Sequence, residues 1–283
     1  MKLFKLPRGL SVWNTPDAAG DTRFLYREMF ERRCYERNGI AVHDGDVVFD
    51  VGANVGMFGL SLMERHGGLQ LYSFEPVPGT FACLQRNLTE SSHYAAHTVE
   101  AFNCALGEAD GETTIEFFPG APSNSTLCSA DKHRDFGRLL EGVRFSDMWR
   151  TGKLRALAML PLFPFRKRLL GPAFDRLMAQ GVSVPCRVGT LSGIIRERGV
   201  SRIDLLKIDV EGAEMSVLAG LEQAHWNLVR QLAMEIEPAN KPLLPSFVDR
   251  LHSLGFTHVV VENMFGGPCD QQDAVACTVF AHR

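Results

Sequence analysis

A glycine-rich turn after a short apolar run is the part of this sequence best suited to hold a ligand. The run at residues 47–49 leads into a turn that contains Asp50, Gly52, Asn54 and Gly56. A strand that enters such a turn before a helix gathers backbone N–H groups at one point, where glycine lets a ligand approach closely. A dinucleotide-binding turn has glycine where this chain has Asn54. The acidic start and the absent glycine favour a ligand with an amine and a carboxylate, such as S-adenosylmethionine, and make these four residues candidates for binding it.

A second acidic residue supports an adenosine ligand. Glu75 ends the apolar run at residues 69–74 and lies about twenty residues beyond the glycine-rich turn, the usual separation for a carboxylate that binds two ribose hydroxyls. NAD enzymes share this carboxylate, so Glu75 alone does not identify the ligand. A helix-capping or surface carboxylate is the alternative role for Asp50 and Glu75. Both, however, follow strand-like runs, where parallel sheets bind their ligands.

Three more carboxylates are candidates for catalysis. Asp209 and Glu211 follow the apolar run at residues 205–208, and Glu237 ends the run at 231–237. We expect them at the same sheet edge, where they could take the proton of a weakly nucleophilic hydroxyl during methyl transfer. Burial near an apolar pocket raises the pKa of a carboxyl group and improves it as a base. Three alternatives stay open, namely a histidine base, binding of the cofactor's amine by Asp209, and a Mg²⁺ ion held by the three acids.

Strand-like and helix-like segments alternate along the chain. Five short apolar runs have the composition of buried strands, at residues 47–51, 70–74, 97–103, 203–208 and 231–237. Helical stretches are expected at residues 57–65, 81–90, 190–198, 215–221 and 245–254. This order predicts a parallel sheet covered by helices on both faces. Two further strand-like runs, at 257–262 and 274–281, have only a Gly-Gly-Pro turn between them and predict an antiparallel pair that closes the sheet.

Several segments resemble, in order along the chain, the FkbM family of S-adenosylmethionine-dependent methyltransferases. They are VVFDVGANVG, SFEP, NCALG, LKIDVEGAE and MEIEP, which begin at residues 47, 73, 103, 206 and 234. FLYREMF, which begins at residue 24, resembles the N-terminal helix of family members from natural-product pathways. The resemblance implies a seven-stranded, mostly parallel Rossmann-like sheet, and it adds Tyr26, Asn103 and Ala105 to the candidate cofactor-binding residues.

A helix is expected at about residues 20–40, with the aromatic residues Phe24, Tyr26, Phe30 and Tyr35 among many charges. It could simply cover the sheet. It could also line the ligand site, because a dry, aromatic enclosure favours a reaction in which the positive charge of a sulfonium disappears.

A strand-like run at residues 112–118 leads into a polar turn that contains Ser123, Asn124 and Ser125. These side chains could hydrogen-bond the acceptor or the carboxylate of the cofactor. A plain surface turn explains the same composition.

Composition and charge fit a single enzyme-sized domain over residues 1–283. The chain is 45% apolar and has a net charge of −3, which predicts no general affinity for nucleic acid. Its seven cysteines form no C-x-x-C pair and are odd in number, so the sequence signals neither a zinc site nor a disulfide framework. No leader or bilayer-spanning run is apparent, so we expect a cytoplasmic protein without stable membrane insertion.

An insertion at about residues 131–181 matches nothing in the family resemblance. Between residues 144 and 168, seven basic residues face the single acid Asp147 and flank an apolar stretch at 154–165. This composition predicts either a solvated helical lid or a surface that docks an acidic carrier protein, an anionic substrate or a membrane face.

These features together predict an S-adenosylmethionine-dependent O-methyltransferase that acts on a hydroxyl of a natural product, such as a polyketide, a glycoside or a carrier-tethered intermediate. N-methylation of an amine is the nearest alternative. A non-catalytic cofactor-binding module and a nicotinamide oxidoreductase are alternatives from other classes. The sequence leaves the acceptor and the oligomeric state open.

Overall fold

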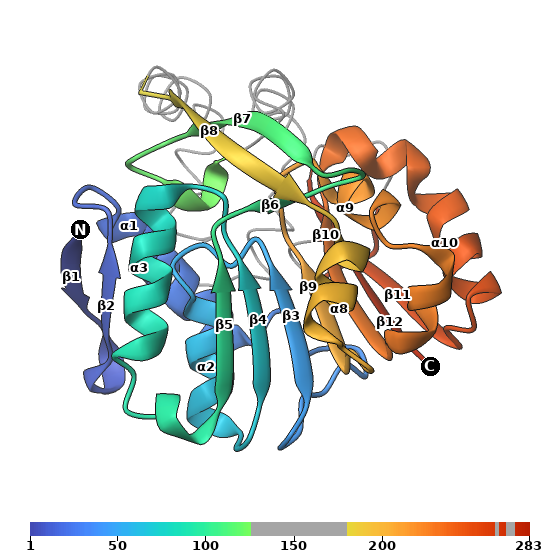
Figure 1. The fold of residues 1–283 in the computed structure, drawn as a ribbon, viewed down its shortest axis with the longest axis horizontal. Coiled ribbons are helices and arrows are strands. Elements are labelled where there is room, and N and C mark those ends of the chain that lie inside the picture. The colour runs from blue at the N-terminus through green and yellow to red at the C-terminus, as the bar shows by residue number, and fades with distance from the viewer. Residues whose placement is uncertain (126–179, 264–265, 270–274) are drawn as a thin grey trace, which may run out of the picture.

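The computed structural model describes residues 1–125, 180–263, 266–269 and 275–283 (Figure 1). The insertion predicted at residues 131–181, with its basic residues, lies almost wholly outside these ranges. The helical lid and the docking surface therefore stay predictions.

A seven-stranded sheet forms the centre of the molecule, in the order β11-β12-β10-β9-β3-β4-β5 (Figure 1). Its strands are β3 (Val47–Val51), β4 (Gln70–Phe74), β5 (Thr98–Phe102), β9 (Leu205–Ile208), β10 (Gln231–Ile236), β11 (His258–Asn263) and β12 (Cys277–His282). The five strands from β10 to β5 are parallel, and β12 pairs antiparallel with both β10 and β11. The predicted mostly parallel sheet with an antiparallel closing pair is confirmed.

Helices cover both faces of this sheet. They are α1 (Ala19–Tyr26), α2 (Met57–Arg65), α3 (Pro78–Thr89), α8 (Leu191–Arg198), α9 (Glu214–Ala219) and α10 (Leu244–Ser253). Apolar side chains of α1, α2 and α3 pack with Val48 on one face, whereas those of α8, α9 and α10 pack with Phe49 on the other. Successive strand residues point to opposite faces, so both faces of β3 are buried and its sequence is apolar almost throughout.

Short helical turns connect the main elements. They are η1 (Pro7–Gly9), η2 (Arg27–Arg32, π-helical), η3 (Tyr94–Ala96), η4 (Pro122–Asn124), η6 (Gln223–Leu228) and η7 (Pro238–Leu243). No helix in the described parts of the chain is long and apolar enough to cross a membrane.

The predicted N-terminal helix is shorter than expected. It runs from α1 into η2 and ends at Arg33, whose φ of 48° is left-handed. Asn38 and Gly39 also have positive φ. Left-handed residues end a helix and reverse the chain, and the residues between them form turns instead of the predicted continuation to residue 40. Tyr35 lies in this turn segment and is buried.

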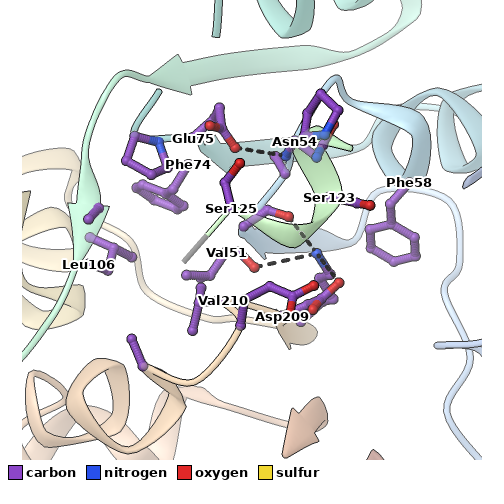
Figure 2. Close-up of a pocket in the computed structure, with 18 of the residues that line it drawn as sticks. Val51, Asn54, Phe58, Phe74, Glu75, Leu106, Ser123, Ser125, Asp209 and Val210 are labelled. Atoms are coloured by element: carbon purple, nitrogen blue, oxygen red, sulfur yellow. Dashed lines mark hydrogen bonds and ion pairs between the residues drawn. The ribbon is translucent and has the colours of Figure 1, made fainter. Parts of the chain in front are cut away.

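Two small sheets flank the central one. An N-terminal hairpin pairs β1 (Lys2–Lys5) with β2 (Ser11–Asn14). A three-stranded sheet has the order β6 (Ala105–Leu106), β8 (Val182–Gly189), β7 (Gly111–Phe117). Figure 1 shows this second sheet above the carboxyl ends of β3, β4 and β5. It therefore forms part of the wall of the pocket shown in Figure 2.

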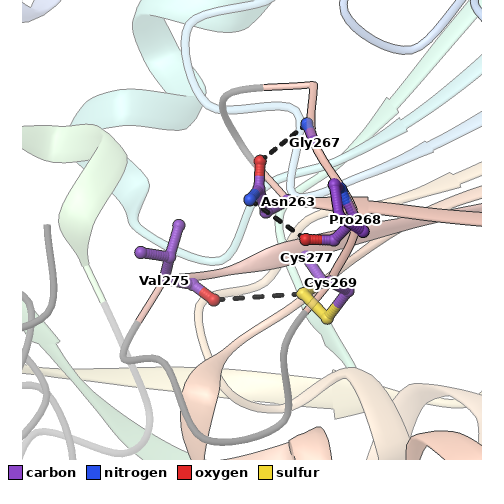
Figure 3. The surroundings of a disulfide bond; sticks show 6 residues. All are labelled: Asn263, Gly267, Pro268, Cys269, Val275 and Cys277. Carbon is purple, nitrogen blue, oxygen red and sulfur yellow. Dashed lines mark hydrogen bonds between the residues drawn. A yellow bond between two sulfur atoms is a disulfide. The ribbon is translucent and has the colours of Figure 1, made fainter. Parts of the chain in front are cut away.

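A disulfide joins Cys269 to Cys277, whose Cα atoms are 6.0 Å apart (Figure 3). The side chain of Asn263 supports this region, since its Oδ1 accepts the Gly267 N–H at 2.9 Å and its Nδ2 donates to the Pro268 carbonyl at 3.2 Å. The sequence signalled no disulfide framework, and for this pair that interpretation was wrong. The pairing arises because the chain reverses between β11 and β12, which neither the number nor the spacing of cysteines reveals.

We expect the denatured but unreduced protein to expose five reactive thiols, because two of the seven cysteines are joined in the disulfide. Thiol titration in denaturant measures this directly, and prior reduction should raise the count to seven. The variant Cys269→Ser is the control and should give six thiols with or without reductant. Seven thiols in the unreduced wild type would show that the bond does not form.

Candidate active site

A pocket opens at the carboxyl ends of β3, β4 and β9 (Figure 2). It contains about 840 Å³ of space that protein atoms do not fill, part of it open to solvent, which is within the size range of small-molecule sites. Leu25 and Met29 from the N-terminal helix, Phe58 from α2 and Phe74 from β4 give it apolar walls. Glu75 and Asp209 lie on different sides of it (Figure 2).

Three residues of the glycine-rich turn have positive φ angles. Gly52 has a φ of 78°, and a Cβ placed there would lie 1.8 Å from the carbonyl oxygen of Asp209. Gly56 has a φ of 83° and caps α2, while Asn54 is left-handed with a φ of 51°. Glycine is thus required at position 52 because the turn after β3 packs against the loop after β9. This requirement holds whether or not a ligand approaches the turn. Of these residues, Gly52 and Asn54 line the pocket.

Glu75 is held at the pocket wall by backbone hydrogen bonds. Its carboxylate accepts the N–H groups of Asn54 at 3.1 Å and Val77 at 2.9 Å. Burial raises its pKa to about 7, although these hydrogen bonds act in the opposite direction. Asn103 donates to the carbonyls of Glu75 at 2.9 Å and Pro76 at 3.0 Å. Asn103 is not among the described lining residues. Its two hydrogen bonds instead hold the backbone of the loop that contains Glu75.

Asp50 lies beneath the turn and pairs with Lys207. Asp50 is fully buried, and its Oδ1 is 3.0 Å from Lys207 Nζ. Lys207 also donates to the carbonyl of Gly52 at 2.9 Å. Burial alone would lower the pKa of Lys207, but the carboxylates of Asp50 and Asp209 raise it above its ordinary value. Lys207 therefore stays charged and ties the glycine-rich turn to β9, while Asp50 is absent from the described pocket lining.

Two of the three predicted catalytic acids lie together at the pocket. Asp209 and Glu211 both line it, and the Asp209 side chain is 26% exposed. Glu237 follows β10 at the start of η7 and is not part of the lining that the structure describes. Within the described ranges, no group of three or more His, Cys, Asp or Glu side chains is arranged to hold a metal ion.

The remaining predicted residues divide between the pocket and the core. Ala105 lines the pocket. Tyr26 stacks on Phe30 with ring centroids 5.1 Å apart and is absent from the described lining, although its helix contributes two other lining residues. Ser123 and Ser125 of the polar turn line the pocket, and Ser123 Oγ donates to Asp21 of α1.

The sequence analysis gave no polar role to three buried residues, namely Lys207, which lines the pocket, and Tyr35 and Glu235, which are outside its described lining. It considered Tyr35 only as an aromatic residue of the N-terminal helix. Lys207 has a detectable signal, because a lysine inside the apolar run at residues 205–208 requires a buried partner. Tyr35 and Glu235 carry no comparable signal. Their role depends on the contacts of Tyr35 with Asp209 and Glu235, which come from distant parts of the chain.

The pocket suits S-adenosylmethionine. A buried carboxylate at Glu75 is the acceptor that ribose hydroxyls need, and it is already oriented by two backbone donors. Apolar walls suit an adenine ring and exclude water from a sulfonium. An acidic group at Asp209 attracts a cation, on the far side of the pocket from Glu75.

Comparison with known proteins places the chain in a family. The Methyltransferase FkbM domain matches residues 50–257. The 31-O-demethyl-FK506 methyltransferase FkbM of Streptomyces tacrolimicus is 35% identical over 94% of each chain. Methyltransferase sdnD of Sordaria araneosa is 31% identical over 83% of this chain and 82% of its own. The AMB antimetabolite synthetase AmbE of Pseudomonas aeruginosa is 32% identical over 83% of this chain and 10% of its own. The chain belongs to the FkbM methyltransferase family and is an S-adenosylmethionine-dependent methyltransferase.

Proposed function

We propose that this enzyme transfers a methyl group to a hydroxyl oxygen of a small-molecule natural product. The observation that carries the proposal is the partly exposed carboxylate of Asp209 at the pocket, fixed by a 2.7 Å hydrogen bond from the Tyr35 hydroxyl. A hydroxyl needs such a base because it is a weak nucleophile at neutral pH. The relative named a 31-O-demethyl-FK506 methyltransferase supports oxygen over nitrogen as the acceptor atom.

Different residues of the pocket would bind the cofactor and remove the proton of the acceptor. Glu75 would bind the ribose hydroxyls, and the turn with Gly52 and Asn54 would lie against the rest of the cofactor. S-adenosylmethionine, when bound, supplies a methyl group whose C–S bond breaks, with its electron pair going to sulfur, as the acceptor oxygen bonds to the carbon. Asp209 takes the hydroxyl proton, so the acceptor becomes a neutral ether.

The apolar walls have a role in this reaction. Leu25, Met29 and Phe58 line the pocket and would limit the water around the reacting groups once the cofactor is bound. Positive charge disappears from sulfur as the methyl group moves, so a poorly solvated enclosure favours the transition state over the charged ground state. The N-terminal helix would thus contribute to catalysis as well as cover the sheet.

The source of the acceptor is a further part of the proposal. AmbE is a synthetase of which this chain covers only 10%, and a methyltransferase segment within a larger synthetase is consistent with a tethered acceptor. We therefore keep a carrier-tethered intermediate beside a free one. Selection of the acceptor by the insertion at residues 131–181 and a cytoplasmic location stay predictions.

The test is to incubate the purified enzyme with methyl-labelled S-adenosylmethionine and extracts of the native host. Mass spectrometry should find one product that gains a methyl group, and fragmentation should place the label on oxygen. Label on nitrogen would overturn the O-methylation proposal. Binding of S-adenosylmethionine without any labelled product would favour a non-catalytic module, and calorimetry with NAD tests the oxidoreductase alternative.

The affinity for S-adenosylhomocysteine should fall as the pH drops below about 7. Glu75 accepts charge-assisted hydrogen bonds from both ribose hydroxyls only when ionised. Its pKa in the free protein is raised to about 7, so binding of this kind at lower pH must first release a proton. Calorimetry across this pH range measures the effect.

The matched control is Glu75→Gln, which keeps the shape of the side chain and removes its titration. The ligand's own amine also ionises near this range, so the informative quantity is the difference between the two pH profiles. We expect the variant to bind more weakly by about 1.5–3 kcal/mol, the value of a hydrogen bond to a charged group, at a pH well above 7. Identical pH profiles would show that Glu75 does not contact the ribose.

A further inference from the structure

A buried tyrosine joins two acids behind the pocket. Tyr35 is 4% exposed, and its hydroxyl donates to Asp209 Oδ2 at 2.7 Å. Glu235 Oε2 lies 3.4 Å from the same hydroxyl oxygen. The three residues come from the turn after η2, the loop after β9 and the carboxyl-terminal part of β10. Asp209 is therefore held from behind by a group that is far from it in sequence.

The ring of Tyr35 is held on two sides. Phe58 of α2 meets it edge to face with centroids 5.7 Å apart, and Lys207 Nζ lies 5.3 Å from its centroid. These contacts fix the hydroxyl independently of its hydrogen bonds. A change that removes only the hydroxyl should consequently leave the ring in place.

The charges around Tyr35 determine the direction of these hydrogen bonds. Asp50 and Asp209 face the ammonium group of Lys207, and the thiol of Cys34 is also close. Glu235 lies near the carboxylates of Asp209, Glu211, Glu214 and Glu237. Burial raises the pKa of Glu235 well above its ordinary value, and the neighbouring carboxylates, Asp209 first, add to this. Burial likewise raises the pKa of Tyr35. A protonated Glu235 can donate to the Tyr35 oxygen, which leaves the Tyr35 proton for Asp209.

We propose that Tyr35 is a positioning residue for methyl transfer, because its hydroxyl donates a 2.7 Å hydrogen bond that orients the Asp209 carboxylate at the pocket. This rests on the proposed role of Asp209 as the base. Tyr35 lies outside residues 50–257, the range matched by the family domain. The N-terminal segment therefore completes the active site with a polar group in addition to its apolar lining.

The physical reason for such a residue is the placement of Asp209 in a loop. Asp209 follows the last residue of β9, and its backbone N–H donates to the Val51 carbonyl at 3.0 Å. This bond fixes the main chain but leaves the side chain free to rotate. A displacement of about 1 Å can lower a rate by about a hundredfold. A strong hydrogen bond from a fully packed tyrosine removes that freedom.

The test compares three variants with the wild type. Tyr35→Phe removes the hydroxyl and keeps the ring contacts. Glu235→Gln removes the proton-bearing carboxyl but keeps an N–H donor that can face Tyr35. Tyr72→Phe is the matched control, because Tyr72 is also buried on the sheet but packs against Phe49, away from the pocket lining.

In the activity assay, Tyr35→Phe should lower kcat by about ten- to hundredfold. The KM for the acceptor should change little. Its affinity for S-adenosylhomocysteine, measured by calorimetry, should equal that of the wild type. Glu235→Gln should retain much more activity than Tyr35→Phe, and Tyr72→Phe should resemble the wild type. Equal kcat in Tyr35→Phe and Tyr72→Phe would overturn the proposal.

Infrared spectroscopy tests the hydrogen bonds among Glu235, Tyr35 and Asp209 without any acceptor substrate. The carbonyl band of protonated Glu235 should stand out in the difference spectrum between the wild type and Glu235→Gln, because burial raises the pKa of Glu235 well above its ordinary value. The subtraction removes the bands of Glu75 and Glu214, whose pKa values are raised to about 7. The band should disappear in Glu235→Gln, shift in Tyr35→Phe and stay unchanged in Tyr72→Phe. A spectrum unchanged in Glu235→Gln or Tyr35→Phe overturns the network, whereas a nitrogen-methylated product with the expected spectra overturns only the proposed acceptor atom.

Discussion

Asp209→Asn should lower kcat by about two to four orders of magnitude, the usual contribution of a general base. Asparagine is nearly the same size as aspartate, can still meet the Tyr35 hydroxyl and lacks the charge that takes a proton. The affinity for S-adenosylhomocysteine should change much less, because Glu75 and the glycine-rich turn provide separate contacts. Steady-state kinetics on the acceptor, together with calorimetry, measure both quantities.

Glu211→Gln is the matched comparison, since Glu211 also lines the pocket. We expect it to lose less activity than Asp209→Asn, because the structure holds Asp209 with Tyr35 and places Lys207 Nζ 3.8 Å from it. Near-normal turnover in Asp209→Asn with a large loss in Glu211→Gln would move the base to Glu211. Near-normal turnover in both would contradict a base at this edge of the pocket.

The strands and helices that bury both faces could be predicted closely from the sequence. The expected segments at residues 47–51, 70–74 and 57–65 coincide with β3, β4 and α2. Burial on both faces makes such segments continuously apolar, and the turns between them are short. Local composition therefore contains nearly all the information that specifies them.

The peripheral sheets were harder to predict. The hairpin of β1 and β2 was not expected, and neither was β8, which pairs with β7 through residues such as Thr113 and Cys186. β8 is only partly buried, with a mixed polar sequence. Its pairing joins residues about seventy positions apart, and such long-range register leaves no periodic signal in a single sequence.

In the candidate site, too, some residues could be predicted from local sequence and others depend on long-range contacts. Position at the carboxyl end of a strand was enough to select Glu75, Asp209 and Glu211, and all three line the pocket. Tyr35 could not be selected this way, because its approach to Asp209 depends on a helix that ends earlier than its composition suggests. Residues that support a site from behind are thus identified by packing and not by motif.

Lys207→Met should destabilise the protein by about 3–5 kcal/mol, the typical cost of removing one partner of a buried ion pair. Asp50 is fully buried and lies 3.0 Å from the Lys207 ammonium, so the variant would leave its carboxylate without a cation. Methionine fills a similar volume, which limits the effect of an empty cavity. Urea denaturation measures the free energy of unfolding.

The double variant Lys207→Met/Asp50→Asn separates charge from packing, because it removes both ions and should recover most of the lost stability.

A pH series gives an independent check. Burial already raises the pKa of Asp50 in the presence of Lys207, and loss of the cation raises it further. An acid with a raised folded-state pKa destabilises the fold as pH rises through the range between its unfolded and folded values. The deficit of Lys207→Met should therefore shrink as the pH falls. If the loss of unfolding free energy did not depend on pH and persisted in the double variant, the role of Lys207 would instead be its hydrogen bond to the Gly52 carbonyl. The affinity for S-adenosylhomocysteine should then fall in both variants.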